Sequence, residues 1–487
     1  MIHRIALTMN DFNLIPILPE LFLGLAAMGL LMVGVFNGNK STFVVTWASV
    51  LACVLSALIL MGISWADTSV MNDMFAMNSF IALAKILILV GLMFALILSA
   101  QYLYDDHMAR FEFPVLVLLA GLGMMLMVSA NNMLSLYIGL ELQSLSLYVL
   151  AAFRRHSIKS SEAGVKYFIL GALSSGMLLF GISMLYGFTG TISFELMGQT
   201  FAAEALSVGA LVGMVFVLAG LAFKISAVPF HMWTPDVYQG APTNVTALFA
   251  MVPKVAAMAI LIRLLNGPFA GMGDQWEQII YFLAVASLLV GSFAALAQDN
   301  IKRLMAYSSI GNMGYALIGV VVGTAAGVAS VMTYLSIYVV MTAGVFAVLM
   351  CMRREGLSVH KISDLSGLSQ NNPMLAYALA ILMFSMSGLP PMAGFLGKLV
   401  VFEAAVAAEY YVLAVLGVLA SVVAAYYYLR VIKVMFFDEP AHEFDKGLPF
   451  GRGVVLGVSV GFVLFFIVKP DMLIAPMQVA AQTLFAG

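Results

Sequence analysis

Residues 223–242 read FKISAVPFHMWTPDVYQGAP, and they begin at the end of a long apolar run. Lys224 stands in that run, Pro229 follows five residues later, and His231 follows seven residues after the lysine. A lysine within hydrocarbon is costly, and a proline there removes a helix hydrogen bond. Together they predict an interrupted helix that handles charge inside a membrane.

The composition indicates a polytopic membrane protein. Of the 487 residues, 63% are hydrophobic and only 9% are charged, whereas soluble domains carry about 25% charged residues. The basic residues form no patch long enough to follow phosphates, which argues against nucleic-acid binding. Cys53 and Cys351 lie far apart in apolar runs. We therefore expect no cysteine-held iron–sulfur or zinc site in this chain.

Fourteen apolar runs are long enough to cross the roughly 30 Å of hydrocarbon in a bilayer. The first is longer than a signal-peptide core and is interpreted as a retained span. We expect an all-α fold with about 14 transmembrane helices in a single membrane domain, residues 1–487. The runs cover residues 14–36, 41–62, 77–99, 113–129, 131–153, 164–186, 206–235, 242–265, 277–297, 301–322, 327–351, 374–404, 408–435 and 451–469.

The charges of the predicted loops alternate along the chain. Lysine and arginine mark the cytoplasmic side of a membrane. This rule predicts a multi-pass protein whose termini both lie outside, on the side opposite the cytoplasm. The basic set of loops holds Lys40, Arg110, Arg154, Arg155, Lys159, Lys302, Arg303, Arg353, Arg354, Lys361 and Lys446, and the opposite set holds Asp67, Asp73, Glu195, Glu204 and Asp274.

Two spans are longer than a bilayer requires, and each contains helix breakers. The seventh has Ser226 and Pro229, and the twelfth has Ser387 followed by Pro390 and Pro391. The two spans lie an odd number of crossings apart, so they enter the membrane from opposite sides. This pattern is typical of inverted repeats with a discontinuous helix in each half. We expect three N-terminal spans in residues 1–110, a first repeat of five helices in 111–265, an inverted second repeat of five in 277–435, and a last span in 451–470.

Eight charged residues remain inside the predicted spans. A charge at a helix centre costs about 2.5–3.5 kcal/mol on insertion scales, so these side chains must face the bundle interior, form pairs or hold water. Arg263 and Glu403 lie near the outer edges and are interpreted as anchors, and no motif assigns a role to Lys85. The set is Lys85, Glu141, Lys166, Lys224, Lys254, Arg263, Lys398 and Glu403.

Glu141 lies deep in the fifth span, where Ser144 and Tyr148 share its helix face. Lys224 is its leading partner. A buried lysine releases its proton more easily when a neighbouring carboxylate moves away or is protonated, so the pair is a candidate proton switch. The alternative is a structural ion pair. His231 would share the face of Lys224 and relay protons, or it would only form a hydrogen bond at a helix end.

Three further lysines extend this set. Lys254 lies in mid-span after Pro253, Lys398 follows the second break, and Lys166 begins the sixth span. With Glu141 and Lys224 they would form a row of titratable groups in the membrane plane. Lys166 would alternatively extend to the membrane surface. The cluster that contains Lys302 is interpreted as a topological anchor.

At these motifs the chain resembles subunit N of the proton-pumping NADH:quinone oxidoreductase, respiratory complex I, which is one of its antiporter-like membrane subunits. The resemblance covers residues from about 110 to 435. The stretch from Trp233 to Pro242 is highly specific for subunit N. Lys398 is a lysine as in subunits N and L, whereas subunit M typically has glutamate there, and subunit L typically continues into a long C-terminal helix. The matching motifs are Glu141-x-x-Ser144, Phe223 to Pro242, Asn300 to Ser309, and Gly394 to Lys398.

The resemblance implies a role for each matching residue. Glu141 would be the fifth-span carboxylate, with Lys224 as its seventh-span partner. Lys254 would be the central connecting lysine, and Lys398 the twelfth-span lysine near the exit side. Lys166 matches a sixth-span lysine. The chain departs from many relatives at Asn312, where they have histidine, and asparagine cannot titrate.

The resemblance also implies the partners. The chain would translocate protons, driven by quinone reduction in partner subunits that bind FMN, the iron–sulfur clusters and the quinone, and it would bind no cofactor or metal itself. Its partners would be the other membrane-arm subunits, including the other antiporter-like ones. The alternatives are a subunit of a multisubunit cation/proton antiporter, which shares the layout of charged helices, and an assembly scaffold whose charges are only structural.

Overall fold

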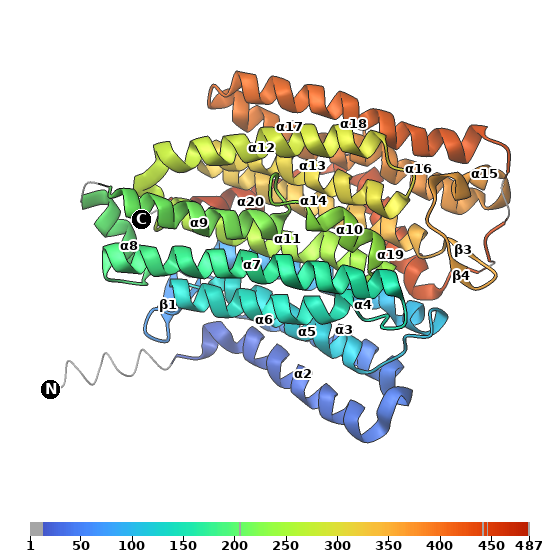
Figure 1. Cartoon of the computed structure of the whole chain (residues 1–487), viewed down its shortest axis with the longest axis horizontal. Helices are drawn as coiled ribbons and strands as arrows, with labels where there is room; N and C mark the ends of the chain where they lie inside the picture. Colours follow the sequence, from blue (N-terminus) through green and yellow to red (C-terminus); the bar gives the residue numbers. More distant parts are fainter. Residues whose placement is uncertain (1–12, 204–205, 441–442, 446, 486–487) are drawn as a thin grey trace.

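The computed structural model describes residues 13–203, 206–440, 443–445 and 447–485. Long helices run side by side along the molecule (Figure 1). The helices of the first half are α2 (Leu18–Asn37), α3 (Thr42–Gly62), α4 (Ser79–Asp105), α5 (Glu112–Ser129), α6 (Met133–Ala151), α7 (Ile158–Thr189), α8 (Phe194–Ala203), α9 (Val208–Ile225), α10 (Trp233–Gly240) and α11 (Thr243–Asn266).

The second half is also helical, and two short antiparallel hairpins complete the fold. Its helices are α12 (Gly273–Leu296), α13 (Ile301–Val321), α14 (Ala325–Leu349), α15 (Leu368–Asn371), α16 (Pro373–Ser387), α17 (Ala393–Ala407), α18 (Tyr411–Phe437), α19 (Phe450–Phe465) and α20 (Asp471–Gln482). The strands are β1 (Thr68–Val70) with β2 (Phe75–Met77), and β3 (Arg353–Arg354) with β4 (Leu357–Ser358), and the 3-10 helices are η1 (Ile15–Ile17), η2 (Gly38–Ser41), η3 (Ala270–Met272), η4 (Ile362–Leu365) and η5 (Phe466–Val468).

Each of the fourteen predicted spans contains a helix. Within the described residues, twelve helical stretches are long and apolar enough to cross a membrane. One of these stretches, Ile15–Gly62, contains both α2 and α3. Helices α16 and α17, which the second break separates, are each too short to be counted as a span alone. The prediction of an all-α polytopic membrane protein is confirmed.

Both predicted helix interruptions are present. α9 ends before Ser226, which takes a left-handed conformation with φ +62, and a cis bond joins Val228 to Pro229. α16 ends before Gly388, with φ +85, and a cis bond joins Pro390 to Pro391. In both breaks, a residue in the left-handed conformation is followed by a cis bond to proline. This arrangement separates α9 from α10 and α16 from α17.

The two sets of five helices share further local features. Asn132 caps α6 and forms an isolated antiparallel bridge with Ser193, which follows α7. Asn300 caps α13 and forms the same kind of bridge with Lys361, which follows α14. These matched positions support the inverted repeat, which stays a prediction.

Helix pairs at corresponding places in the two sets pack backbone against backbone. A Cβ atom built on Gly123 of α5 would lie 2.4 Å from the backbone nitrogen of Gln143 in α6. One built on Gly291 of α12 would lie 2.5 Å from the backbone nitrogen of Gly311 in α13. Only glycine allows these two contacts.

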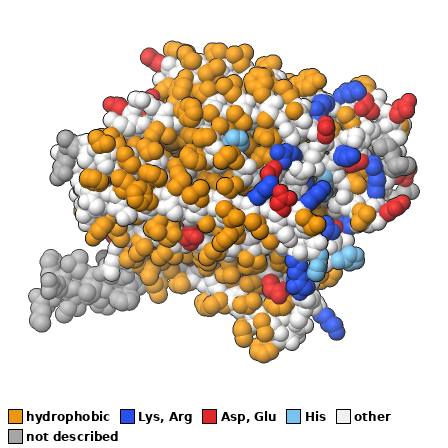
Figure 2. All heavy atoms as spheres, viewed as in Figure 1, with side chains coloured by type: hydrophobic (Ala, Val, Ile, Leu, Met, Phe, Trp, Pro, Cys, Tyr) orange, Lys and Arg blue, Asp and Glu red, His pale blue; other side chains and the backbone are white. Residues whose placement is uncertain are grey.

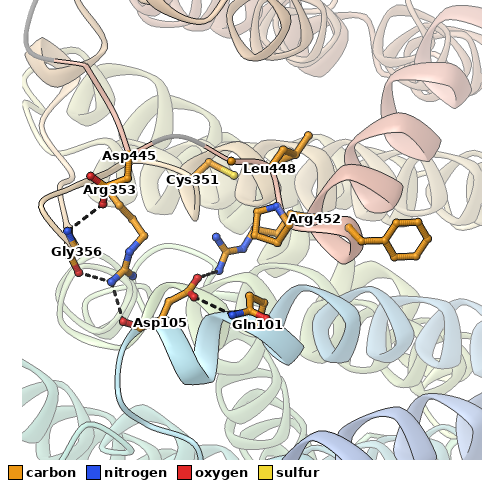
Figure 3. Close-up of a pocket in the computed structure, with 11 residues that line it drawn as sticks. Gln101, Asp105, Cys351, Arg353, Gly356, Asp445, Leu448 and Arg452 are labelled. Carbon is orange, nitrogen blue, oxygen red and sulfur yellow. Dashed lines mark hydrogen bonds and ion pairs between the residues drawn. The ribbon is translucent and has the colours of Figure 1, made fainter.

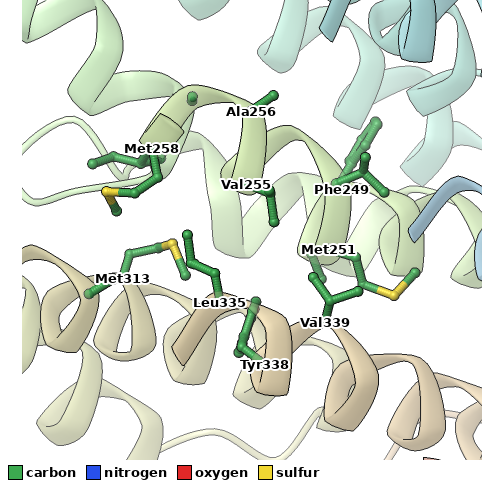
Figure 4. Packing of buried hydrophobic residues seen from close by; sticks show 14 of the residues in the cluster. Phe249, Met251, Val255, Ala256, Met258, Met313, Leu335, Tyr338 and Val339 are labelled. Atoms are coloured by element: carbon green, nitrogen blue, oxygen red, sulfur yellow. The ribbon is translucent and has the colours of Figure 1, made fainter. Parts of the chain in front are cut away.

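Helix α11 lies at the centre of the bundle, and all of its residues from Thr243 to Leu265 are buried. Figure 4 shows side chains of α11, among them Met251, Val255 and Met258, facing side chains of α13 and α14 such as Met313 and Leu335. Because its whole length is enclosed, α11 is shielded from lipid by the other helices. Any charge on α11 must therefore be satisfied by protein groups or by internal water.

Charged side chains divide the molecule into two ends. On the face shown in Figure 2, lysine and arginine gather at the end that carries α15, β3 and β4, which we call the basic end. This division agrees with the alternation of loop charge. Glu204 and Lys446, which the loop-charge argument used, lie outside the described residues.

An ion-pair network joins α4, the β3–β4 hairpin and α19 at the basic end (Figure 3). Arg353 donates to Asp106 at 2.5 Å and to the Asp105 carbonyl at 2.8 Å. Arg452 donates to the Asp105 carboxylate at 2.5 Å, and Arg154 pairs with Asp106 at 3.4 Å. Burial alone would raise the pKa of the Asp106 carboxyl, but the hydrogen bond from Arg353 and the other partners bring this pKa below its usual value. The network attaches the N-terminal spans to the rest of the bundle.

The last crossing extends beyond the predicted span of residues 451–469. After α19 and η5, the chain forms α20, and both α19 and α20 pack along α14. Pro470 lies between η5 and α20. α20 is not among the helices predicted from the sequence.

Gly123→Ala should lower the stability of the α5–α6 pair, because the added methyl group meets backbone that cannot rotate away. Overpacking of this kind costs about 1–3 kcal/mol. Gly176→Ala is the control, because nothing lies within 4 Å of its Cβ position. The apparent melting temperature of the purified protein should fall for Gly123→Ala only. Equal melting temperatures would contradict the tight packing.

Asp106→Asn should be more damaging, because it leaves Arg353 buried without its carboxylate. Removing one partner of a buried pair costs about 3–5 kcal/mol. Because the folded-state pKa lies below the unfolded value, this stabilisation is present above the unfolded pKa and is lost as pH falls through the folded one. Melting temperatures measured across acidic pH should therefore converge for wild type and Asp106→Asn. The control is Asp438→Asn, whose exposed pair with Lys433 should contribute about 0–1 kcal/mol.

Candidate functional site

Three buried lysines have nearly the same surroundings. Lys224, Lys254 and Lys398 are 4%, 0% and 6% exposed. Their ammonium groups donate to serine hydroxyls, to Ser144 at 2.7 Å, Ser309 at 2.5 Å and Ser421 at 2.8 Å, respectively. A tyrosine ring lies near each amine, with Tyr148 and Tyr238 at 5.7 Å and Tyr315 at 4.6 Å. Within the described part of the chain, none of the three lysines has a carboxylate within 4.0 Å.

A hydroxyl beside an amine has a specific chemical consequence. A serine oxygen accepts a hydrogen bond from a charged ammonium group, and its own proton can be donated to a neutral amine. The surroundings of Lys224, Lys254 and Lys398 therefore accommodate both protonation states. A carboxylate partner would instead favour the charged state alone.

The helix breaks help to create these sites. Lys224 lies one residue before the end of α9, beside the first break. Lys398 reaches back across the second break and donates to the Ser387 carbonyl at 3.0 Å. That carbonyl is at the C-terminal end of α16, where helical acceptors have no partner in their own helix. Lys254 follows Pro253, which lacks the amide proton of a normal helix position.

Glu141 does not form the expected direct pair with Lys224. The ammonium group of Lys224 donates to Ser144 instead, and no ion pair joins it to Glu141 among the described residues. The side chain of Glu141 is half-buried, and its Oε1 is buried without a hydrogen-bond partner in the described structure. Ser144 and Tyr148, which were predicted to share the helix face of Glu141, are the residues that lie beside Lys224.

The structure separates His231 and Lys166 from this set. The shared-face argument for His231 is wrong, because the helix ends at Ile225 and does not continue to residue 231. Lys166 has a side chain that is 41% exposed, and it pairs with Glu162 at 2.8 Å and Asp236 at 2.7 Å. Lys166 thus belongs to the surface of the basic end.

A set of hydrogen-bonded hydroxyls and one amide lies between Lys254 and Lys398. Most of these residues were not among the predicted site residues. Ser309 shares a hydrogen bond with Tyr338 at 2.6 Å, and its neighbour Ser308 shares one with Tyr428 at 2.6 Å. Asn312 donates to Ser308 at 3.3 Å and accepts from Tyr334 at 2.7 Å. The available signal was the polar face of α13, where Ser308, Asn312 and Tyr315 recur at helical spacing.

These polar side chains meet Lys398 at a narrow gap. The gap is lined by Ser308, Asn312, Tyr315, Lys398 and Tyr428, and it has no room for a water molecule in this conformation. Protons would therefore need either rearranged side chains or a widened gap to pass. The amide of Asn312 does not titrate, and it contributes hydrogen bonds only.

Lys302, which was interpreted as part of a topological anchor, is buried. It is 2% exposed and donates to the carbonyls of Gln239 at 3.2 Å and Ala241 at 2.5 Å. These carbonyls lie at the C-terminal end of α10, where a positive charge is stabilising. Burial is the main cause that lowers the pKa of His360 to about 3, and the nearby positive charge of Lys302 is the second. His360 therefore stays neutral at pH 7.

Two of the remaining charges within spans, Lys85 and Arg263, have structural partners, whereas Glu403 is exposed. Lys85 forms an ion pair with Glu20 at 2.6 Å, and both side chains are buried. This pair joins α4 to α2 and answers the open question about Lys85. Arg263 donates to the carbonyls of Val128 at 2.7 Å and Ala130 at 2.5 Å, which anchors α11 to the end of α5.

The described residues contain no group of three or more histidine, cysteine, aspartate or glutamate side chains that could hold a metal ion. The groups described around Lys224, Lys254 and Lys398 are amines, hydroxyls and the amide of Asn312. Such a set can bind and release protons.

Known proteins resemble this chain over almost its full length. The family model described as NADH:quinone oxidoreductase/Mrp antiporter, transmembrane, matches residues 130–424. NADH-quinone oxidoreductase subunit N of Paramagnetospirillum magneticum is 50% identical over 98% of this chain and 99% of its own length. The subunit N protein of Parvibaculum lavamentivorans is 52% identical over 96% of this chain and 97% of its own length.

Solved structures agree with these relatives. A chain of respiratory complex I from Thermus thermophilus matches with a TM-score of 0.80 and 31% identity, covering 95% of this chain and 99% of that one. A chain of the Mrp complex from Dietzia sp. matches with a TM-score of 0.82 at 22% identity, covering 96% of this chain and 97% of that one, and this likeness concerns the fold alone. The identity to named relatives over nearly the whole length decides the assignment: the chain belongs to the subunit N family of NADH-quinone oxidoreductase.

Proposed function

We propose that this chain carries protons across the membrane as the antiporter-like subunit N of NADH:quinone oxidoreductase, and that Lys224, Lys254 and Lys398 carry them. The observation that supports this path is the shared environment of the three buried lysines. Each amine contacts a serine hydroxyl and a tyrosine ring, and none has a carboxylate partner in the described structure. Each is thus suited to gaining and losing a proton.

Glu141 would control the first lysine. An opposite charge stabilises a buried ammonium group strongly, because the surroundings have a low dielectric constant. Glu141 lies on the same helix as Ser144, which binds Lys224. A shift of its carboxylate toward Lys224 would favour proton uptake there, and its withdrawal or protonation would favour release toward Lys254. Lys166 and His231 would have no direct part in this transfer.

Quinone reduction in partner subunits would supply the energy, and FMN, the iron–sulfur clusters and the quinone would be bound there. The partners would be the other membrane-arm subunits of the complex, including the other antiporter-like subunits. The basic end would face the cytoplasm, in accordance with the preference of lysine and arginine for that side. Both termini would then be periplasmic in a bacterial inner membrane.

The path would follow an internal repeat. We assign residues 111–265 and 277–435 as the two inverted five-helix repeats, preceded by three spans in 1–110 and followed by a last span that starts near 451. The matched breaks after α9 and α16 support this division. The matched caps and bridges at Asn132 and Asn300 also support it. Lys224 belongs to the first repeat and Lys398 to the second, so the path would cross from one to the other at Lys254.

A multisubunit cation/proton antiporter is the second candidate function, because the matching family model also covers Mrp antiporters. The relatives near 50% identity favour NADH:quinone oxidoreductase. Co-purification separates the two functions. NADH dehydrogenase subunits in the purified complex support the first, and a small set of antiporter subunits without them supports the second.

Lys224→Ala and Glu141→Ala should each abolish or strongly reduce NADH-driven proton pumping while the complex still assembles. The first variant removes a proton carrier, and the second removes the charge that controls it. The measurement is acidification of inverted membrane vesicles, normalised to the amount of assembled complex. Lys433→Ala is the control, because this lysine is on the surface with a side chain that is 64% exposed. Wild-type pumping in both test variants would refute the proposed path and favour a purely structural role for the charges.

A further inference from the structure

A chain of aromatic rings links Lys224 to Lys254. Tyr148 lies beside Lys224, and its ring contacts Tyr167 with centroids 4.9 Å apart. Tyr167 stacks on Trp233 at 4.6 Å with an interplanar angle of 21°. Trp233 in turn contacts Tyr238 at 6.3 Å, and Tyr238 lies beside Lys254. Four rings thus form an unbroken path between two lysines.

The middle of this path is apolar. Tyr167 and Trp233 are both buried, and Phe223 and Phe249 flank the stacked pair with centroids 5.5 Å from Trp233 and 5.2 Å from Tyr167, respectively. The indole nitrogen of Trp233 donates to the Phe223 carbonyl at 3.0 Å. It is therefore not free to pass a proton along the path.

The side chains between Lys254 and Lys398 differ from the aromatic rings between Lys224 and Lys254. We call the line of these three lysines the lysine row. From Lys254 to Lys398 the neighbouring side chains are hydroxyls and an amide, with Ser309 bound to Tyr338, Ser308 bound to Tyr428, and Asn312 bound to Tyr334. Hydrogen-bonded groups can pass protons once side chains rearrange at the gap beside Lys398, whereas stacked rings must first separate and admit water. The two halves of the row therefore have unequal barriers.

Helix α10 carries two of the four rings and is held at its outer side by charges. Trp233 is its first residue and Tyr238 lies five residues later. Asp236 of the same helix accepts from Lys166 of α7 at 2.7 Å and from Arg303 of α13 at 2.6 Å. The chain on its N-terminal side is the non-helical break after α9. α10 is thus a short helix with a break at one end and ion pairs to both repeats.

We propose that the stacked pair Tyr167 and Trp233 is a gate that prevents protons from passing freely between Lys224 and Lys254, and that a shift of α10 opens it. This inference rests on the proposed role of the lysines. With the gate closed, a proton on Lys254 moves through the polar half toward Lys398 rather than back to Lys224. Trp233 and Tyr167 are positioning residues in this scheme, since they control the transfer without carrying the proton.

The test compares two buried tryptophans in the assembled complex reconstituted in liposomes. Trp233→Ser removes the gate, and the pH gradient formed per NADH oxidised should fall, because protons return through the opened path. Trp233→Phe keeps a ring and should hold a larger gradient than Trp233→Ser. Trp276→Ser is the matched control, since Trp276 is also buried and its indole donates to a backbone carbonyl, that of Phe269 at 3.1 Å, but it lies outside the ring path.

A gradient per NADH that is as large for Trp233→Ser as for Trp276→Ser would overturn the gate. An equal loss in Trp233→Phe and Trp233→Ser would also overturn it, because packing or the indole hydrogen bond would then explain the loss. If Trp233→Ser does not assemble, Tyr167→Leu removes the other member of the stack and is judged by the same criterion.

The lysine variants separate failure of the gate from failure of the path. Normal pumping in Lys224→Ala and Lys254→Ala would refute the proposed path itself. Lost pumping in both of these variants, together with a full gradient in Trp233→Ser, would refute the gate alone.

Discussion

The ammonium group of Lys254 cannot be left in hydrocarbon, and the arrangement of the bundle follows from this constraint. It lies on α11, a helix that is buried along its whole length. Enclosure alone would still leave the charge without an acceptor, and the Ser309 hydroxyl of α13 supplies one. The apolar packing of α11 against α13 and α14 therefore brings the hydroxyl to the amine, and the polar row is built outward from this contact.

The broken helices satisfy the same requirement at the two other lysines. A continuous helix uses its own carbonyls, whereas an interrupted one leaves acceptors free in the middle of the membrane. At the second break the Ser387 carbonyl accepts from Lys398. At the first break the freed segment forms α10, whose C-terminal carbonyls accept from Lys302. The two breaks thus have the same backbone geometry but different uses. One holds a lysine directly, and the other creates a short helix that ion pairs tie to α7 and α13.

The division of the row into an aromatic and a polar half gives the proposed pump a direction. Glu141 and Lys224 lie on the aromatic side, and Lys398 lies on the polar side. A carrier that binds protons at one end and releases them at the other needs a high barrier at some point, because an open row would only leak. The stacked rings between Lys224 and Lys254 are suited to be that barrier, and α10 is suited to move it.

The amino-acid sequence by itself determined the fold class, the positions of the long apolar helices and the two helix breaks, because apolar length and proline act locally along the chain. It also singled out Lys224, Lys254 and Lys398 as charges within apolar runs. The resemblance at residues 223–242 also led to the family, since that motif is contiguous. Only the tertiary structure decided which groups meet: Lys224 binds Ser144 rather than Glu141, His231 lies beyond the helix end, and Lys166 pairs with Asp236 on the surface. Serine and tyrosine contacts such as Lys254 with Ser309 join helices far apart in the sequence, and they depend on how the helices pack, which no local pattern encodes.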